Sequence, residues 1–274
     1  MPELPEVETV KNTLKIDIIG KTITNVVINY AKIIKNVDED TFCKSLKGQT
    51  FLDVKRKGKY LIFILDDYYL IGHMRMEGKY FLMHDEEIGK HDHIIFYFKD
   101  SNLRYNDTRK FGTMHLYKKS DYSLDDLCKI EPLNELGPEP FDISKDDLYK
   151  KVKKSSKAIK SLLLDQKVIS GLGNIYVDEV LYLSHLAPFE VSSKLDYNDV
   201  SNIVDSAVEV LNKAIALGGT TIHSFESSHG ITGRFQNELL VHTKDTCPKC
   251  GAPIKKIKVG GRGTYYCENC QKIK

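Results

Sequence analysis

The sequence lacks long apolar runs and a strong excess of either charge. None of its apolar runs approaches the roughly 18 residues that a membrane-spanning helix needs, and no basic stretch followed by an apolar one opens the chain. We therefore expect a cytoplasmic protein that has no membrane partner. The 40 Lys and Arg side chains nearly cancel the 38 Asp and Glu side chains, so the net charge of +2 does not by itself indicate a polyanionic partner.

The positive charge is concentrated in the second half of the chain. Residues 150–160 contain six lysines and no acidic residue, and residues 244–274 contain seven Lys and one Arg against two acidic residues. A solvated lysine-rich face would explain one such run, but two runs in one half weaken that interpretation.

The first 131 residues have the pattern of a helix followed by a β domain. Val7, Val10 and Leu14 recur at helical spacing, and Gly20 supplies a stop. Residues 22–117 then alternate between β-branched or aromatic runs and turn signals, which predicts an antiparallel β-sandwich or flattened barrel. The predicted strands are 23–28, 60–65, 68–71, 94–98 and 113–117.

The second half is predicted to be helical. We place a linker at residues 132–145, because its prolines lack the amide donors that a helix or a central strand requires. A helical domain at 146–240 and a cysteine-rich finger at 241–274 follow, so the fold class is α+β. The predicted helices are 148–164, 175–186 and 200–217, with a Gly-Leu-Gly turn at 171–173 between the first two.

Two Cys-x-x-Cys pairs, separated by 16 residues, predict one structural zinc ion. Four thiolates close a tetrahedral shell and leave no position for a catalytic water; iron is the minor alternative. The four ligands are Cys247, Cys250, Cys267 and Cys270. The remaining Cys43 and Cys128 are predicted to be buried small apolar residues.

The segment between the cysteine pairs, residues 255–266, reads as a basic hairpin with a glycine turn. Such a hairpin could place Arg262 against phosphates or in a groove. By itself the finger could equally be a metal-stabilised scaffold or a protein-binding module.

The N-terminus starts as Met1-Pro2-Glu3-Leu4-Pro5, which by itself is an ordinary helix start. A small second residue usually permits removal of the initiator Met, and this would leave the secondary amine of Pro2 at the end of the chain. An α-amino group titrates near pH ~8 rather than ~10.4 for lysine, so it is a ready nucleophile at neutral pH.

In order and spacing, seven segments of the chain resemble those of the formamidopyrimidine-DNA glycosylase family over essentially its whole length. The segments are 2–9, 56–60, 73–78, 105–112, 136–140, 171–176 and 261–264. The resemblance implies an N-terminal helix with an antiparallel β-sandwich, a helix-two-turn-helix domain and a four-cysteine β-hairpin zinc finger. It also implies base-excision repair: removal of 8-oxoguanine and formamidopyrimidines from duplex DNA, then cleavage of the abasic site by β,δ-elimination.

The family resemblance assigns roles to four residues near the reacting sugar. Pro2 would attack C1′ and form an iminium, and Glu3 would act as general acid and base beside it. Glu6 would hold the N-terminal helix in its active geometry. Lys59 would contact phosphates and sugar from a β-hairpin, although on its own it could be an ordinary surface lysine.

The resemblance also implies how the duplex is held while the base is outside the stack. Met76, Arg109 and Phe111 would fill the gap from the minor groove, although composition alone favours Met76 and Phe111 as core residues. The residues that match phosphate-binding positions are Lys160, Asn174 and Arg262, and weaker matches for a loop over the extruded purine at 220–235 are Thr220 and Thr221.

Two other classes remain open from the sequence. The related endonuclease VIII type prefers oxidised pyrimidines, but it usually begins Pro-Glu-Gly-Pro, where this chain has Leu4. A noncatalytic zinc-finger DNA-binding protein would explain the finger and the basic runs but would give Pro2, Glu3 and Lys59 no task. The chain departs from the family at Val241-His242-Thr243, where the family often has an aromatic residue.

We expect a monomer that binds damaged duplex DNA in the bacterial nucleoid, with no redox cofactor and no catalytic metal.

Overall fold

The computed structural model describes residues 1–220 and 233–274, and the chain divides into two compact units. The first comprises Met1–Asn134 and Thr220–Gly233; of the latter segment only the two end residues are described. The second comprises Glu135–Gly219 and Arg234–Lys274. The division after Asn134 lies inside the segment 132–145, where the sequence placed a linker.

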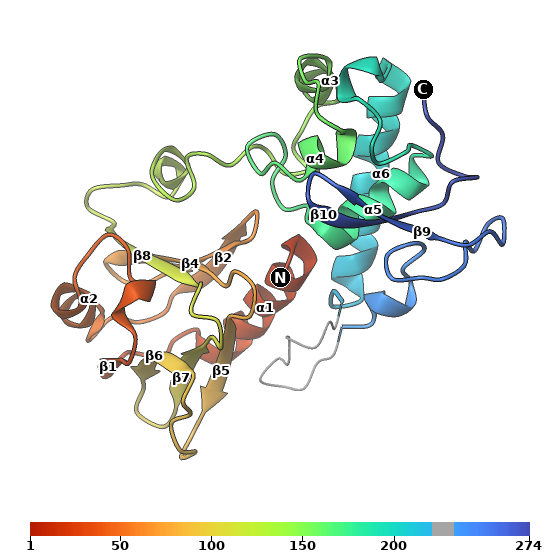
Figure 1. Ribbon diagram of the computed structural model, residues 1–274. Helices are drawn as coiled ribbons and strands as arrows, with labels where there is room; N and C mark the ends of the chain where they lie inside the picture. The colour runs from red at the N-terminus through yellow and green to blue at the C-terminus, as the bar shows by residue number, and fades with distance from the viewer. Residues whose placement is uncertain (221–232) are drawn as a thin grey trace. The chain divides into compact units, whose positions relative to one another are not determined.

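The first unit begins with α1 (Leu4–Ile18), as predicted (Figure 1). Its first turn contains Pro5, which lacks only an amide that no helical carbonyl would accept. The helix ends before Gly20, whose φ of 81° a residue with a side chain rarely adopts. Val7, Val10 and Leu14 are buried in the core of this unit.

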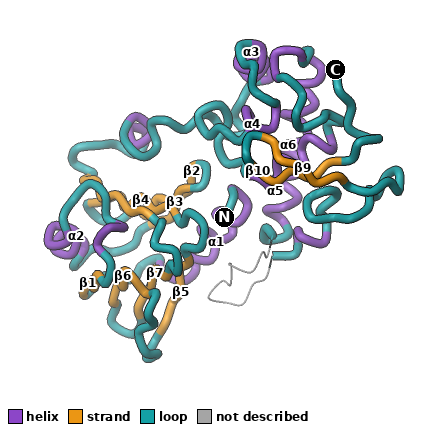
Figure 2. The backbone as a smooth tube through the Cα atoms, in the orientation of Figure 1, coloured by secondary structure: helices purple, strands orange, loops and turns teal. Residues whose placement is uncertain are grey.

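Two four-stranded antiparallel sheets follow, which confirms the predicted sandwich (Figure 2). One sheet has the order β1-β6-β7-β5 and the other the order β2-β3-β4-β8. The strands of the first sheet are β1 (Asn25–Ile28), β6 (Asp92–Tyr97), β7 (Asn102–Asn106) and β5 (Lys79–Met83). Those of the second are β2 (Asp53–Lys57), β3 (Tyr60–Ile64), β4 (Tyr68–His73) and β8 (Thr113–Lys118).

One hydrophobic cluster joins both sheets to α1 and to α2 (Glu39–Leu46). Within this cluster Phe51 stands edge-on to Phe63 and Phe96, with ring centroids 5.8 and 6.2 Å away. The sequence analysis missed α2, which is short and lies within a β-rich region. Its start is nevertheless encoded locally, because the Asp38 carboxylate accepts a hydrogen bond from the Thr41 amide at 2.8 Å. Two 3₁₀ turns complete this unit, η1 (Ala31–Ile33) and η2 (Asp125–Lys129).

The second unit is helical and ends in a two-stranded hairpin. Its helices are α3 (Lys145–Lys153), α4 (Ile159–Leu163), α5 (Asn174–Leu183) and α6 (Tyr197–Ala216), with 3₁₀ turns η3 (Ser192–Lys194) and η4 (Phe235–Asn237). The hairpin is formed by β9 (Lys255–Val259) and β10 (Arg262–Tyr266).

Two predictions about local structure were wrong. The expected helix at 148–164 is broken between α3 and α4, because the carbonyls of Ser155 and Lys157 accept hydrogen bonds from the amides of Ser193 and Ser192 instead. Cys128 is exposed rather than buried, and Cys43 is only partly buried. Among residues 1–220 and 233–274, no helix is both long and apolar enough to cross a membrane.

Candidate active site and nucleic-acid interface

The start of α1 is buried although it carries two carboxylates. Pro2 is buried, and Glu3 and Glu6 are 2% and 4% exposed. Glu6 Oε2 accepts a hydrogen bond from the Glu3 amide at 2.8 Å. Its other oxygen, Oε1, accepts hydrogen bonds from the Thr220 amide at 2.8 Å and the Thr220 hydroxyl at 3.0 Å. The backbone beside Pro2 is therefore fixed from two sides by one carboxylate.

Two ion pairs align the β2-β3 hairpin with α1. Lys15 near the end of the helix pairs with Asp53 at 2.7 Å, and Glu8 near its start pairs with Arg56 at 2.7 Å. The strand therefore runs toward the start of the helix, and the hairpin turn after Arg56 points to the end where Pro2 lies. Lys59 occupies that turn and is 5% exposed.

Strand register brings two further loops to the same end of the second sheet. Tyr60 pairs with His73, and His73 pairs with Thr113. These three paired residues lie in a row across the sheet. Lys59 directly precedes Tyr60, residues 74–78 follow His73, and residues 107–112 lead into Thr113. In the other sheet Lys79 pairs with Asn106, so both loops cross side by side from one sheet to the other.

These two loops carry the three residues expected to enter the duplex. Met76 is half-buried in the first loop, and Arg109 and Phe111 are exposed in the second. Phe111 is 53% exposed, so its alternative interpretation as a core residue is wrong. The Arg109 guanidinium lies over the Phe111 ring, 4.8 Å from its centroid. Their cation–π contact holds the exposed apolar ring of Phe111 next to a hydrogen-bond donor.

Asp107, which sequence reasoning did not single out, organises the second loop. It is fully buried, and its Oδ1 accepts a hydrogen bond from the Arg109 amide at 3.0 Å. Its Oδ2 accepts hydrogen bonds from the Gly112 amide at 2.8 Å and the Tyr105 hydroxyl at 3.3 Å. One side chain thus fixes both ends of the segment that carries Arg109 and Phe111. The only sequence signal was its place in the motif at 105–112.

Tyr105 also explains two glycines beside these loops. A Cβ on Gly112 would lie 1.7 Å from the Tyr105 hydroxyl oxygen, and a Cβ on Gly78 would lie 2.3 Å from it. Since Tyr105 is 1% exposed, its ring has no room to move aside. Both glycines therefore permit the two loops to approach the same buried phenol.

His73 is a neutral neighbour of this region. Burial lowers its pKa from the ordinary 6.5 to about 3, and the nearby charges of Arg75 and Lys59 act in the same direction. Its Nδ1 accepts a hydrogen bond from the Arg75 amide at 2.8 Å, and its ring stands edge-on to Tyr60 at 4.4 Å. The neutral ring therefore adds no further positive charge to those of Arg75 and Lys59.

The four predicted cysteines converge in the second unit. Their sulfur atoms all lie within 4.8 Å of one another, with Cys247 and Cys270 3.8 Å apart and Cys250 and Cys267 3.5 Å apart. A tetrahedral zinc ion with Zn–S bonds of about 2.3 Å would separate its sulfur ligands by about 3.8 Å. The arrangement is compatible with one structural Zn²⁺. The Tyr182 hydroxyl lies 3.2 Å from the Cys247 sulfur and joins α5 to this site.

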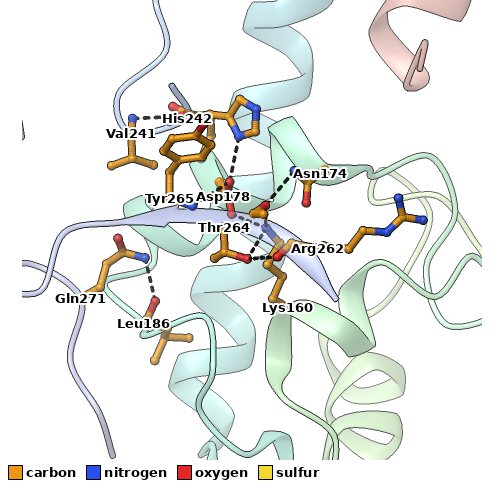
Figure 3. A network of polar contacts seen from close by, with 12 residues as sticks. Lys160, Asn174, Asp178, Leu186, Val241, His242, Arg262, Thr264, Tyr265 and Gln271 are labelled. Atoms are coloured by element: carbon orange, nitrogen blue, oxygen red, sulfur yellow. Dashed lines mark hydrogen bonds and ion pairs between the residues drawn. The ribbon is translucent and has the colours of Figure 1, made fainter. Parts of the chain in front are cut away.

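Of the expected phosphate contacts, Arg262 is exposed, at the start of β10. Lys160 is instead fully buried, and its ammonium faces Asp178 at 2.7 Å. Asn174 begins α5, and its Nδ2 donates to the Gly263 carbonyl at 3.0 Å (Figure 3). In this structure Lys160 and Asn174 therefore support the finger hairpin.

The lesion-loop residues are only partly described. Thr220 lies next to Glu6 as set out above, whereas Thr221 lies outside the described residues. Glu179 was also missed by the sequence analysis. Its buried carboxylate accepts hydrogen bonds from the amides of Leu240, Val241 and His242 at 2.7–3.1 Å, which fixes the chain where it enters the finger.

Three family models cover the described features. The formamidopyrimidine-DNA glycosylase N-terminal domain matches residues 1–114, and the helix-two-turn-helix (H2TH) domain of the same glycosylase matches residues 136–226. A zinc finger found in FPG and IleRS matches residues 244–273. The architecture thus defines a DNA repair glycosylase class with a zinc finger.

Whole-chain comparisons agree with these matches. Formamidopyrimidine-DNA glycosylases of Oceanobacillus iheyensis and Bacillus licheniformis are each 46% identical, over 99% of this chain and 98% and 100% of theirs. A point mutant of Lactococcus lactis FPG in complex with Fapy-dG-containing DNA has a TM-score of 0.92 at 42% identity, and covers 99% of this chain and 100% of its own. The L. lactis protein with abasic-site DNA has a TM-score of 0.91. The chain belongs to the formamidopyrimidine-DNA glycosylase family.

Proposed function

We propose that the protein excises oxidised purines, 8-oxoguanine and formamidopyrimidines, from duplex DNA and then cleaves the abasic site. The observation that carries the proposal is the convergence at the start of α1. Buried Pro2 and Glu3 stand there, and two ion pairs direct the Lys59 turn toward the same end. The relatives named above support the substrate class, since one of them is described with Fapy-dG in DNA.

The chemistry follows from a secondary amine at this position. After Met1 is removed, the Pro2 nitrogen attacks C1′ of the damaged nucleotide and the glycosidic bond breaks, so the base leaves with the bonding electrons and a proton. The C1′–O4′ bond then opens, O4′ takes a proton, and the nitrogen lone pair forms the iminium. Loss of a C2′ proton expels the 3′ phosphate, and a second elimination expels the 5′ phosphate.

Glu3 is suited to the proton transfers in this sequence. It is next to Pro2 in the chain, and the hydrogen bond from its amide to Glu6 fixes its backbone. A carboxyl group that gives a proton to O4′ can, once ionised, take the proton from C2′. Lys59 would hold a phosphate of the reacting nucleotide, because an ammonium there offsets the charge of the leaving phosphate.

Removal of the base requires that it leaves the stack. Arg109 and Phe111 share one loop, and Met76 stands on the loop beside it, so all three can enter the duplex together. Arg109 would bond the orphaned cytosine while Phe111 wedges between base pairs. The wedge offsets part of an unstacking cost of about a few kcal/mol.

Phosphate contacts and the zinc finger would hold the duplex from the second unit. Arg262 is an exposed cation at the turn of the finger hairpin, and one zinc ion on the four cysteines would make that hairpin rigid. Thr220 and Thr221 would begin the segment that covers the extruded purine. We propose that the enzyme acts as a monomer on chromosomal DNA in the bacterial cytoplasm.

Borohydride trapping tests the proposal. The protein, with Met1 removed, is incubated with duplexes that carry 8-oxoguanine opposite cytosine, an oxidised pyrimidine, or no lesion. A covalent adduct is expected only with the oxidised purine, and Pro2→Gly should abolish it. Pro5→Ala is the matched control, since it changes a helix proline that has no free amine. Binding without an adduct would support a noncatalytic DNA-binding protein, and trapping on the pyrimidine alone would support the endonuclease VIII type.

A further inference from the structure

Lys160 belongs to a basic run, yet its ammonium is enclosed by three acceptors. It donates to Asp178 Oδ1 at 2.7 Å, to the Thr264 hydroxyl at 2.9 Å and to the Gly263 carbonyl at 3.1 Å (Figure 3). The side chain is 0% exposed. These three contacts match the three protons that an ammonium can donate.

Asp178 connects this ammonium to the rest of the finger. Its second oxygen, Oδ2, accepts a hydrogen bond from the Tyr265 amide at 3.2 Å and lies 2.8 Å from His242 Nδ1. The carboxylate is 0% exposed. Through these contacts Asp178 joins α5 to the hairpin and to the segment that enters the finger. We call Lys160, Asp178, Thr264 and His242 the hairpin anchor.

The contacts of the hairpin anchor converge on the residues that follow Arg262. Lys160 donates to Gly263 and Thr264, Asp178 accepts from the Tyr265 amide, and the Thr264 hydroxyl also donates to the Arg262 carbonyl at 3.0 Å. Asn174 adds a second hydrogen bond to the Gly263 carbonyl. Arg262 is thus an exposed side chain on a backbone that is fixed from α4 and α5.

The other side of the turn is also closely packed. Gly260 has a φ of 55°, and a Cβ there would lie 2.4 Å from the Ser161 hydroxyl oxygen on α4. The turn therefore approaches α4 more closely than a residue with a side chain at this position would allow. Both sides of the Arg262 turn are determined by contacts with the helices.

Stability alone does not explain a buried ion pair. Its desolvation opposes its Coulomb attraction, and apolar residues of the same volume often serve a core equally well. The pair does, however, give the hairpin one defined position, because its hydrogen bonds are directional. We propose that Lys160 and Asp178 are positioning residues that set the Arg262 backbone for a phosphate contact, and that Lys160 itself touches no phosphate.

The proposal rests on the proposed DNA binding. It predicts how Arg262 contributes to the affinity of the protein for DNA. A side chain on a fixed backbone loses less freedom when it binds, and ordering one such side chain accounts for roughly a threefold to tenfold change in Kd. One phosphate contact also contributes about one unit to the slope of log K against log salt concentration. Loss of the hairpin anchor should therefore remove the Arg262 contribution while Arg262 is still present.

The experiment measures Kd over a range of salt concentrations for the zinc-loaded protein and a duplex carrying a tetrahydrofuran abasic analogue. Arg262→Ala should weaken binding and lower the slope by about one. The double variant Lys160→Met/Asp178→Leu should have the same effect, and adding Arg262→Ala to it should cause no further change. The double variant Lys145→Met/Asp205→Leu is the matched control, because it removes an exposed ion pair of the same unit and should bind normally.

Zinc content and thermal melting check that each variant is folded. Thr264→Val keeps the ion pair but removes two hydrogen bonds of the hairpin anchor, so it should also raise Kd. It tests the proposal if the double variant does not fold. A double variant with unchanged Kd and slope would overturn the proposal. Additive losses in the triple variant would also overturn it, since Lys160 would then contact a phosphate independently.

The premise can fail separately from the proposal. If Arg262→Ala binds as tightly as the native protein with the same salt slope, Arg262 makes no phosphate contact and the positioning role is overturned. DNA binding and trapping at Pro2 would still stand in that case. If the native protein does not bind the duplex at all, the proposed function itself fails.

Discussion

Glu6 and Thr220 are joined by two hydrogen bonds although they are 214 positions apart in the chain. One carboxylate oxygen of Glu6 accepts hydrogen bonds from both the amide and the hydroxyl of Thr220, and the other accepts a hydrogen bond from the amide of Glu3. The position of the residue next to Pro2 is therefore coupled to the start of the segment proposed to cover the lesion.

Glu6→Gln should disrupt both ends of this connection. The amide has only one oxygen, so a buried NH₂ would face either the Glu3 amide or the donors of Thr220. Leaving such a group unsatisfied costs about 1–3 kcal/mol, and we expect a fall of that size in the free energy of unfolding by urea. The rate of lesion excision should fall at least about tenfold, since an increase of ~1.4 kcal/mol in the activation free energy slows a reaction by a factor of ten.

Thr220→Val is the milder companion variant. It removes only the hydroxyl hydrogen bond and should cost about 1 kcal/mol. If Glu6→Gln excises lesions at the native rate, the carboxylate does not position the catalytic end of α1.

Asp107→Asn should affect duplex substrates through the loop that carries Arg109 and Phe111. Asn has one acceptor where three donors converge, so the loop loses the hydrogen bond at one of its ends. Single-turnover excision from duplex DNA should fall at least about tenfold, which corresponds to ~1.4 kcal/mol. Combining it with Phe111→Ala should give less than the sum of the two effects, because both act on one wedge.

The control for this variant is Asp126→Asn, which changes an exposed carboxylate that bonds Ser123. Native excision rates are expected there. Strict additivity of Asp107→Asn and Phe111→Ala would show that Asp107 acts elsewhere.

Removal of zinc should unfold the finger and abolish DNA binding. In structural zinc sites metal binding supplies about 10–16 kcal/mol of folding free energy, and the hairpin of β9 and β10 is too small to fold alone. After chelation, hydrogen exchange should lose protection in the hairpin while the β-sheets of the first unit keep theirs. Readded zinc should restore binding; full affinity in zinc-free protein would contradict this account.

His73 should make the protein less stable in acid. Its folded pKa is lowered from 6.5 to about 3, so below pH 6.5 the unfolded chain takes up a proton that the folded protein refuses. Stability is therefore lost as the pH falls from 6.5 toward 3, by at most about 1.4 kcal/mol per pH unit. His73→Gln keeps an acceptor for the Arg75 amide and should flatten this slope in urea unfolding at pH 6, 5 and 4. Parallel slopes for the two proteins would show that His73 is not buried in neutral form.

Features encoded locally could be predicted from the sequence. The spacing of Val7, Val10 and Leu14 predicts α1, and the two Cys-x-x-Cys pairs predict the four-cysteine metal site, because each depends on residues close together in the chain. Catalytic roles for Pro2, Glu3 and Lys59 came from the resemblance and stay predictions.

Features that depend on distant partners could not be predicted. Lys160 belongs to a basic run, and nothing in that run indicates that Asp178 and the hairpin would enclose it. The role of Asp107 depends on donors brought together by the turn between β7 and β8, and the helix predicted at 148–164 is broken by hydrogen bonds from Ser192 and Ser193.

The central claim is that the nitrogen of Pro2 forms the covalent intermediate, and peptide mass spectrometry of the borohydride-trapped complex tests it most directly. After digestion of protein and DNA, the account predicts that the sugar remnant is attached to the N-terminal peptide at Pro2, with Met1 absent. Attachment to Lys59 or to another lysine would contradict it.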